Sequence, residues 1–170
     1  AATTLVGQSY GAGRIDLVKR FCHITVALGM IVMTVMAAVM YLSAPVMMEI
    51  MTPVEAIREL GTEVLRIEAW AEPMYAASIV AYGAFVGVGD TLIPAIMNFG
   101  SIWLVRIPVA AFLAPTAGLR GVWIAMCCEL TFRGLIFLWR MWSGRWYRNA
   151  SLRKKENASE FAAQPQTDLE

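Results

Sequence analysis

Charged residues are scarce in this sequence and absent from long parts of it. Asp, Glu, Lys and Arg make up 16% of the 170 residues, whereas soluble domains carry about 25%. Two runs, residues 73–89 and 91–105, contain no charged side chain and are separated by one aspartate, Asp90. Because 58% of the chain is also hydrophobic, it does not fit a soluble domain and predicts a helical hairpin that crosses a membrane.

Motifs of common enzymes are missing as well. The sequence contains no His-Glu-x-x-His, no Gly-x-Ser-x-Gly and no Walker-type glycine-rich loop. Residues 87–90, Gly-Val-Gly-Asp, match the Gly-x-Gly-Asp signature of intramembrane aspartyl proteases, but that chemistry needs two facing aspartates. The other aspartates, Asp16 and Asp168, fall in a loop and in the C-terminal tail. Asp90 itself lies in a turn between two expected helices, where a cap on the following helix explains it. We therefore expect no enzyme and keep this protease as a remote alternative. No metal site or organic cofactor is expected either. The three cysteines, Cys22, Cys127 and Cys128, fall in apolar segments, where we expect them to pack as small apolar side chains. Adjacent Cys127 and Cys128 point to different sides of a helix and cannot bind one metal ion together.

Hydrophobic segments of bilayer length predict the architecture. Four spans are expected at about 21–48, 61–89, 93–114 and 121–142, each near the ~20 residues that cross a hydrocarbon core. Residues 1–13 resemble the end of a fifth span and begin without a methionine, so we expect a fragment cut inside a helix. The predicted fold class is all-α, a polytopic bundle of four full transmembrane helices plus the end of a fifth.

The distribution of Lys and Arg predicts the orientation. The loop that follows residues 1–13 and the segment after the fourth full span are basic, whereas the loop near residues 49–63 is acidic. By the positive-inside rule the two basic segments lie in the cytoplasm, and four spans between them agree with this. Residues 149–170 are polar and are expected to form a disordered cytoplasmic tail. The basic residues are Arg14, Lys19, Arg20, Arg140, Arg145, Arg148, Arg153, Lys154 and Lys155.

Two carboxylates, Glu68 and Glu72, fall within the second span. They are four residues apart and share a helix face, on which Tyr75 and Tyr82 follow. Like charges this close repel, so the pair favours a bound proton or a cation such as Na⁺ between the two groups. Both residues are therefore candidates for cation coupling, although exposure to water in the headgroup region explains Glu68 equally well.

Three further charged residues fall inside the last two spans. Glu129 and Arg133 are four apart, and this order favours an intrahelical ion pair with a structural role. Arg106 has no partner in its own helix, and Glu129 on the next helix is a plausible counter-ion. Asn98 lies about two turns before Arg106 on a similar face, so Asn98 and Arg106 join Tyr75 and Tyr82 as candidates for a substrate cavity.

Helix-bending and close-packing signals are frequent. Gly83 and Gly87 form a Gly-x-x-x-Gly step, as do Gly7 and Gly11, and such steps allow close helix contact. Prolines bend membrane helices, and both features suit a transporter whose helices repack. The prolines in or near the spans are Pro45, Pro73, Pro94, Pro108 and Pro115.

The turn at 84–94, Ala-Phe-Val-Gly-Val-Gly-Asp-Thr-Leu-Ile-Pro, followed by Asn98 and by Trp-Leu-Val-Arg-Ile-Pro at 103–108, resembles the multidrug and toxic compound extrusion (MATE) transporters. Three further blocks agree with that family in order and spacing. Residues 5–13 resemble the end of the second helix of a lobe, 118–125 the entry of the last helix, and Arg140 with 144–146 the closing cytoplasmic edge. The resemblance covers about residues 1–148.

This resemblance implies twelve helices in two six-helix lobes, with residues 1–148 as part of the second lobe: the end of helix eight and helices nine to twelve. It implies export of amphipathic, cationic or aromatic organic compounds by alternating access, driven by H⁺ or Na⁺. In several members of the family that this chain resembles, a carboxylate on the tenth helix takes part in cation coupling. Glu72 lies on that helix about one turn before the expected position, which holds Tyr75.

The implied partners are small organic substrates, membrane lipid and the N-terminal lobe, with no nucleic acid. The implied location is the bacterial cytoplasmic (inner) membrane. A flippase for lipid or polysaccharide precursors, from the same superfamily, is an alternative that predicts a more basic cavity, and Arg106 with Arg133 keeps it open. A non-catalytic membrane scaffold is the fourth possibility, and the buried carboxylates and repeated prolines argue against it.

Overall fold

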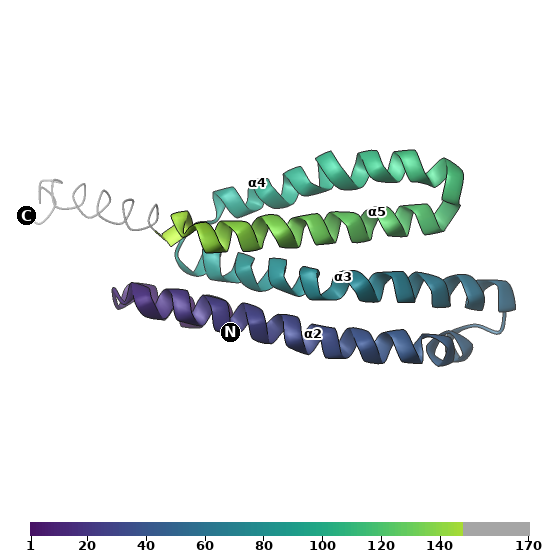
Figure 1. The fold of residues 1–170 in the computed structure, drawn as a ribbon, viewed down its shortest axis with the longest axis horizontal. Coiled ribbons are helices and arrows are strands. Elements are labelled where there is room, and N and C mark those ends of the chain that lie inside the picture. The colour runs from purple at the N-terminus through teal and green to yellow at the C-terminus, as the bar shows by residue number, and fades with distance from the viewer. Residues whose placement is uncertain (148–170) are drawn as a thin grey trace, which may run out of the picture.

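The computed structural model describes residues 1–147, and this part of the chain is built from helices (Figure 1). The predicted all-α class is confirmed. The elements in chain order are α1 (Ala2–Gly11), α2 (Ile15–Met51), α3 (Glu55–Gly87), α4 (Leu92–Ser101), the π-helical turn η1 (Ile102–Arg106) and α5 (Ile107–Ser143).

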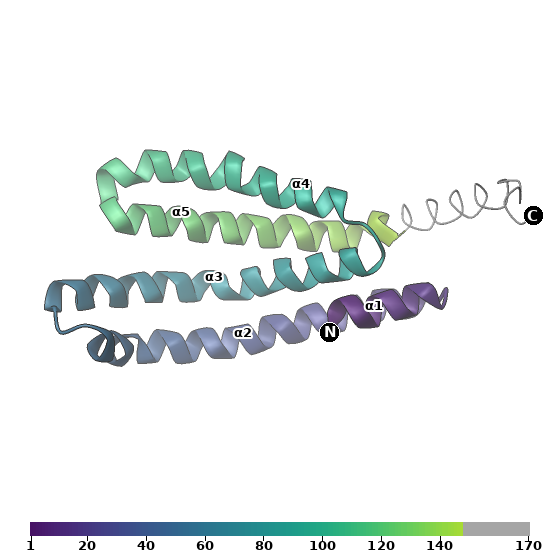
Figure 2. The same cartoon turned by 180° about the vertical axis from the view of Figure 1, so that it is seen from behind.

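The elements form four long antiparallel rods and one short helix, α1. The third rod consists of α4, η1 and the first part of α5, and it reverses direction at Gly118 (Figures 1 and 2). Gly118 has φ 56° and ψ −135°, a conformation that glycine adopts without a Cβ clash. The rest of α5 then returns as the fourth rod. The four rods correspond to the four expected spans.

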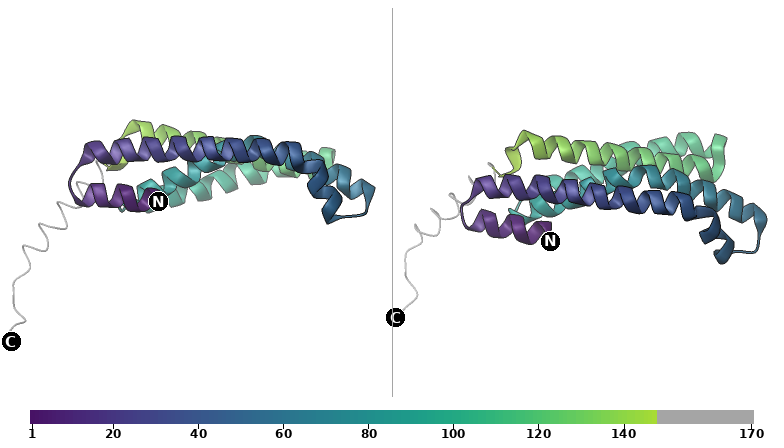
Figure 3. Two further views of the ribbon diagram at one scale, coloured as in Figure 1. Left: turned by 90° about the horizontal axis from the view of Figure 1, so that it is seen from below. Right: turned by 60° about the horizontal axis from the view of Figure 1, so that its bottom comes forward.

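Two helical stretches, 15–51 and 92–143, are long and apolar enough to cross a membrane. The reversal at Gly118 divides the second stretch into two rods. Helix α3 is less apolar than α2 and carries more charged residues, so it does not belong to that set. Near its end α2 contains Pro45, and the last turns bend away from the rod (Figure 3).

Large apolar side chains cover the outside of the rods. This distribution is the reverse of that in a soluble protein and provides a surface for lipid chains. Examples on α2 that are more than half exposed are Leu28, Ile31, Val35 and Leu42.

Helix α3 lies at the centre and packs against α1, α2 and α5. Its contact with α1 is close because two glycines meet there. A Cβ on Gly87 would lie 2.7 Å from the carbonyl oxygen of Thr3, and one on Gly7 would lie 3.0 Å from the carbonyl oxygen of Gly87. Gly83 faces the Thr3 hydroxyl in the same way, whereas Gly11 has no neighbour within 4 Å. Both predicted Gly-x-x-x-Gly steps thus lie at or beside this interface, with three of the four glycines in contact.

The densest packing lies near the ends of the rods where α3 stops and α5 finishes. Phe85 stacks on Phe137 with ring centroids 5.9 Å apart, and the buried Trp146 lies against Phe85 at 5.1 Å. The Trp146 indole N–H donates a hydrogen bond to the carbonyl of Met141 at 3.2 Å. Lys19, at the start of α2, lies over the Tyr147 ring at 5.1 Å. These contacts join the ends of α2, α3 and α5.

The basic and acidic segments lie at opposite ends of the bundle. The α1–α2 turn and the end of α5 share one end, and the α2–α3 loop lies at the other (Figure 1). This arrangement fits the predicted orientation, in which the basic end faces the cytoplasm. Arg148 and the predicted tail 149–170 lie outside the described residues. The tail contains Asp168 and the basic residues Arg153, Lys154 and Lys155.

Candidate functional site

One face of α3 carries polar and aromatic side chains at intervals of two turns. Glu68, Tyr75 and Tyr82 are seven residues apart and therefore follow one another along a single face. Ser78 and Ile79 lie on the same side, and the Ser78 hydroxyl donates a hydrogen bond to the Tyr75 carbonyl at 2.8 Å. This internal bond satisfies the Ser78 hydroxyl within its own helix.

The third rod brings Asn98 and Arg106 to face α3. In an unbroken α-helix eight residues would separate these side chains by about 80° around the axis. The π-helical turn η1 accommodates one extra residue, so the rotation falls to about seven α-helical steps and the offset to roughly 20°. The turn at 102–106 therefore places Arg106 in line with Asn98.

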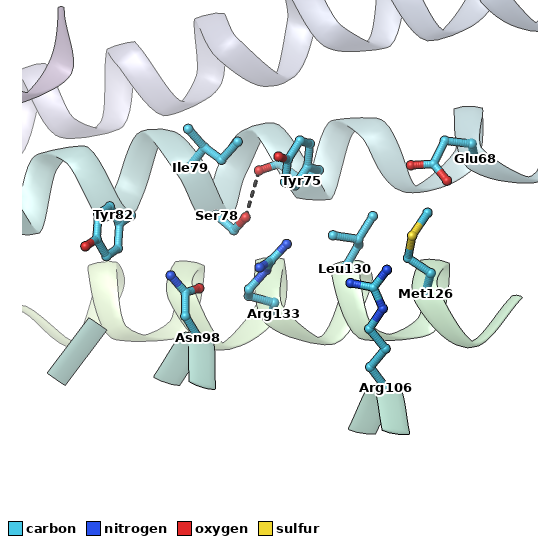
Figure 4. Close-up of a pocket in the computed structure, with 10 residues that line it drawn as sticks. All are labelled: Glu68, Tyr75, Ser78, Ile79, Tyr82, Asn98, Arg106, Met126, Leu130 and Arg133. Atoms are coloured by element: carbon cyan, nitrogen blue, oxygen red, sulfur yellow. Dashed lines mark hydrogen bonds between the residues drawn. The ribbon is translucent and has the colours of Figure 1, made fainter. Parts of the chain in front are cut away.

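These side chains surround a cavity of about 430 Å³ between α3, the third rod and α5. Figure 4 shows Asn98, Arg106 and Arg133 pointing toward the face of α3 that carries the two tyrosines. The lining residues are Glu68, Tyr75, Ser78, Ile79, Tyr82, Asn98, Arg106, Met126, Leu130 and Arg133. The four residues that the sequence indicates for a substrate cavity, and one of the two candidate coupling carboxylates, thus lie around one space.

A buried carboxylate holds the α5 wall of this cavity. Glu129 is fully buried, its Oε1 accepts a hydrogen bond from the Ser101 hydroxyl at 2.6 Å, and the same atom lies 3.4 Å from Arg133 Nε. The Arg133 guanidinium also lies over the Tyr75 ring at 5.6 Å. Arg133 therefore has an anion on its own helix and an aromatic face on α3.

Arg106 differs from Arg133 in its surroundings. Among the described residues Arg106 forms no ion pair, because Glu129, the counter-ion suggested by the sequence, is engaged by Arg133 and Ser101. Glu68 on α3 interacts electrostatically with Arg106, and it also interacts with Glu72 and with the Trp123 indole. The expected Arg106–Glu129 pairing is therefore wrong.

Glu72 lies beside the cavity but does not line it. The side chain is half-buried, and its Oε2 is buried without a hydrogen-bond partner among the described residues. Glu68 Oε2 is in the same situation. Two neighbouring carboxylates thus each keep one oxygen without a protein donor.

Asp90 has a structural contact at the end of α3. Its carboxylate pairs with the Arg140 guanidinium, which also lies over the Phe85 ring at 5.6 Å. Helix α4 has no side-chain cap, so the expected capping role of Asp90 is wrong. The pairing with Arg140 gives Asp90 a role that does not involve protease chemistry.

Several contacts at the site could not be read from the sequence. Ser101 lies 28 residues from Glu129, and its role depends on how the third rod packs on α5. Met126, Leu130 and Ser78 resemble ordinary core positions in the sequence. Within residues 1–147 no group of three or more His, Cys, Asp or Glu side chains could hold a metal ion.

The sequence is similar to known transporters. A family model described as MatE matches residues 1–112. The chain is 30% identical over 157 residues to a "Probable multidrug resistance protein NorM" from Thermotoga maritima, a match that covers 91% of this chain and 34% of that protein. Proteins of the same name match from Deinococcus radiodurans (32% identical; 82% of this chain, 34% of that protein) and Pseudomonas aeruginosa (27% identical; 96% and 34%). The chain spans about a third of the length of these relatives.

Proposed function

The chain belongs to the MatE family of integral membrane proteins, and from this premise we propose that the full-length protein is a secondary active exporter. It takes amphipathic, often cationic or aromatic organic compounds out of the cell in antiport with H⁺ or Na⁺. The names of its relatives as multidrug resistance proteins support this proposal. By the same reasoning it resides in the bacterial inner membrane, with the basic end of the bundle in the cytoplasm.

The observation that carries the proposal is the polar cavity between the rods. A cavity of about 430 Å³ lies within the size range of small-molecule sites and is lined by two tyrosines, an amide and three charged groups. Charged side chains inside a membrane bundle are costly and mark ion or substrate pathways. The aromatic faces suit planar organic compounds, because ring stacking and cation–π contact are available there.

The candidates for ion coupling are Glu72 and Glu68. Each has one carboxylate oxygen without a donor among the described residues, and the two groups repel each other. Binding of a proton or a sodium ion relieves the repulsion between the two carboxylates, and release of the ion restores the repulsion. Because Glu68 lines the cavity and Glu72 lies beside it, binding of the ion can be linked to binding of the substrate through the charge on this part of α3.

Alternating access requires a second body against which this bundle moves. Since the chain spans about a third of its relatives' length, we propose that residues 1–147 work with further helices of the full-length protein, including an N-terminal lobe. The substrate path then runs between the two lobes, and the cavity described above opens onto it.

The test is transport by the full-length protein in liposomes. Ethidium efflux is followed under an imposed proton or sodium gradient for wild type, Glu72→Gln and Glu68→Gln. We expect gradient-driven efflux that either substitution reduces at least tenfold. The matched control is Glu63→Gln, because Glu63 is half-exposed and pairs with Arg120 at 2.6 Å. Wild-type protein that moves no ethidium under either gradient would contradict the proposal.

A flippase for lipid or polysaccharide precursors is the second candidate, and one observation favours it. Two guanidinium groups, Arg106 and Arg133, line the cavity and suit phosphate recognition. Transfer of a fluorescent anionic lipid between leaflets, without a gradient-driven ethidium efflux, would support it.

A further inference from the structure

We infer that a second cleft, between α2 and α3 at the acidic end, binds the headgroup of a phospholipid with a primary ammonium group, as in phosphatidylethanolamine. The phosphate of the lipid lies between Arg58 and Arg66, and its ammonium group lies against Glu59. This cleft is separate from the cavity between α3, the third rod and α5, so its ligand does not depend on what the protein transports. Three observations support the site: the charges that line it, its depth in the membrane and the apolar surface beside it.

The cleft has a volume of about 470 Å³ and lies beside the bend of α2 at Pro45 (Figure 3). On α3 its wall consists of residues that are four apart and of their neighbours, so one side of the helix forms it. Beyond the bend a Cβ on Gly61 would overlap the Met48 side chain, which shows that α2 and α3 touch there. The lining residues are Pro45, Arg58, Glu59, Thr62, Glu63 and Arg66.

Two arginines in the cleft form no ion pair among the described residues. Arg58 donates a hydrogen bond from Nη2 to the Thr52 carbonyl at 3.3 Å, and its Nε is buried without a partner in the described chain. Arg66 lies over the Tyr41 ring at 5.2 Å, a contact that uses none of its N–H groups for a hydrogen bond. The two Cα positions are two helical turns apart, about 12 Å, so the long side chains can reach one phosphate from both ends. Arginine binds phosphate through paired, charge-assisted hydrogen bonds.

Two carboxylates line the same cleft without neutralising these arginines. Glu63 is engaged by Arg120 of α5 at 2.6 Å. Glu59 is exposed and forms no ion pair in the described chain, although it follows Arg58 directly. The cleft thus offers two guanidinium groups and one carboxylate, which complement a phosphate that carries a cationic group. An ammonium group donates N–H bonds to a carboxylate, whereas the trimethylammonium of choline has no N–H and a glycerol headgroup has no cation.

The cleft lies at the depth of the lipid headgroups. About 20 helical residues cross the hydrocarbon core, so counting back from Gly87, the end of α3, the boundary toward the acidic end falls near residue 67. Arg66 is therefore at this boundary, and the rest of the cleft extends outward from it. Tyr41 (39% exposed) and Trp70 (80% exposed) mark the same level, because tyrosine and tryptophan gather at membrane interfaces. A lipid phosphate thus reaches the cleft without leaving its leaflet.

Apolar side chains of α2 provide a surface for the chains of the same lipid. Val35, Val39, Leu42 and Val46 recur at intervals of three or four residues, and each is more than half exposed. At 100° per residue this stripe lies roughly a quarter turn from Pro45, so it adjoins the cleft and runs from it toward the middle of the membrane. A free phosphate ion gains nothing from such a stripe, and the observations therefore favour a lipid over a soluble anion.

Native mass spectrometry of the full-length protein in detergent tests the site. Phosphatidylethanolamine, phosphatidylcholine and phosphatidylglycerol with identical chains are titrated separately, and the dissociation constant of the first bound lipid is determined. We expect wild type to bind phosphatidylethanolamine about fivefold or more tightly than the other two, since one hydrogen-bonded charge pair contributes that much. Inorganic phosphate in large excess is expected not to displace the lipid.

The variants separate the two ends of the headgroup. Glu59→Gln is expected to bring the affinity for phosphatidylethanolamine down to that for phosphatidylcholine, and Glu59→Lys to shift the preference to phosphatidylglycerol. Arg58→Gln and Arg66→Gln are each expected to weaken all three lipids roughly tenfold, because all three carry the phosphate. The matched controls are Glu49→Gln and Arg20→Gln, which alter exposed side chains outside the cleft and should keep the wild-type order.

The possible outcomes are distinct. Equal affinity of wild type for phosphatidylethanolamine and phosphatidylcholine, or a preference that survives Glu59→Gln, overturns the site. Displacement of the lipid by inorganic phosphate assigns the cleft to a free anion and overturns it as well. A preference of Glu59→Lys for phosphatidylglycerol supports the site through a gain that misfolding cannot produce, and size-exclusion profiles that match wild type show that the other variants are folded. Lipid binding is measured without an ion gradient, so its result is independent of ethidium efflux.

Discussion

The hydroxyl of Ser101 and the carboxylate of Glu129 meet at 2.6 Å in a place that is closed to solvent, with Ser101 2% exposed and Glu129 fully buried. Ser101 is the last residue of α4, directly before the π-helical turn, and Glu129 lies on the returning half of α5. This contact fixes the third rod against the fourth at the level of the cavity.

Replacing Glu129 with Leu is expected to lower the free energy of unfolding by about 3 kcal/mol, because the Arg133 charge then lacks its anion in a mostly buried setting. The double variant Glu129→Leu/Arg133→Leu should recover most of that loss. Unfolding by denaturant titration in detergent measures both. Glu63→Gln is the control, with an expected loss of about 0.5 kcal/mol or less, since its pair with Arg120 is exposed. A double variant no more stable than the single one contradicts the explanation.

Gly87→Ala is expected to destabilise the bundle by about 1–3 kcal/mol, because the new methyl group would lie 2.7 Å from the Thr3 carbonyl oxygen and force α1 away from α3. Gly100→Ala is the contrasting change. No atom lies within 4 Å of its Cβ position, so alanine should stabilise α4 by up to about 1 kcal/mol. Thermal unfolding in detergent distinguishes them, and equal shifts for both variants would count against close packing at Gly87.

Asp90→Asn and Arg140→Gln are each expected to cost about 1–3 kcal/mol, because the pair is mostly buried, with side-chain exposures of 12% and 14%. The double variant should cost less than the sum, with a coupling of roughly 1 kcal/mol or more in a double-mutant cycle. Strict additivity would mean that the two charges do not stabilise each other. The loss in Arg140→Gln also includes its contact with the Phe85 ring.

Deleting Leu104 is expected to be tolerated, because one residue fewer converts the π-helical turn into α-helix and leaves the residues on both sides facing as before. Deleting Ile96 from α4 should be damaging, because it rotates the residues before it by about 100° relative to the cavity. Both side chains are more than half exposed. Expression and size-exclusion profiles of the two deletions check this, and a collapse of the Leu104 deletion would be the contrary result.

The sequence was sufficient for the helices and for much of the cavity. Charge-free runs locate the rods, and the seven-residue spacing of Glu68, Tyr75 and Tyr82 indicates one face of α3 before any contact is known. These inferences work because burial in a membrane bundle imposes a periodicity that is local in the chain.

Other features depend on contacts between distant residues and were missed or assigned wrongly. Glu129 was expected to be the counter-ion of Arg106, but in the packed bundle Glu129 contacts Arg133 and Ser101 instead. Asp90 was expected to cap α4, and instead it reaches Arg140 fifty residues away. The π-helical turn at 102–106 also has no composition signal, since its five residues, Ile-Trp-Leu-Val-Arg, would fit an α-helix equally well.

The uneven packing along the rods has a mechanical consequence. Bulky rings join α3, α5 and the segment after it at one end, through Phe85, Phe137 and Trp146. Toward the opposite end the buried contacts come mainly from small side chains such as Ala44, Val64 and Ala69. When helices are held together at one end, a given rotation displaces each of them more at the end that is farther away. The largest displacement is therefore expected at the acidic end, and the cavity lies between that end and the ring cluster.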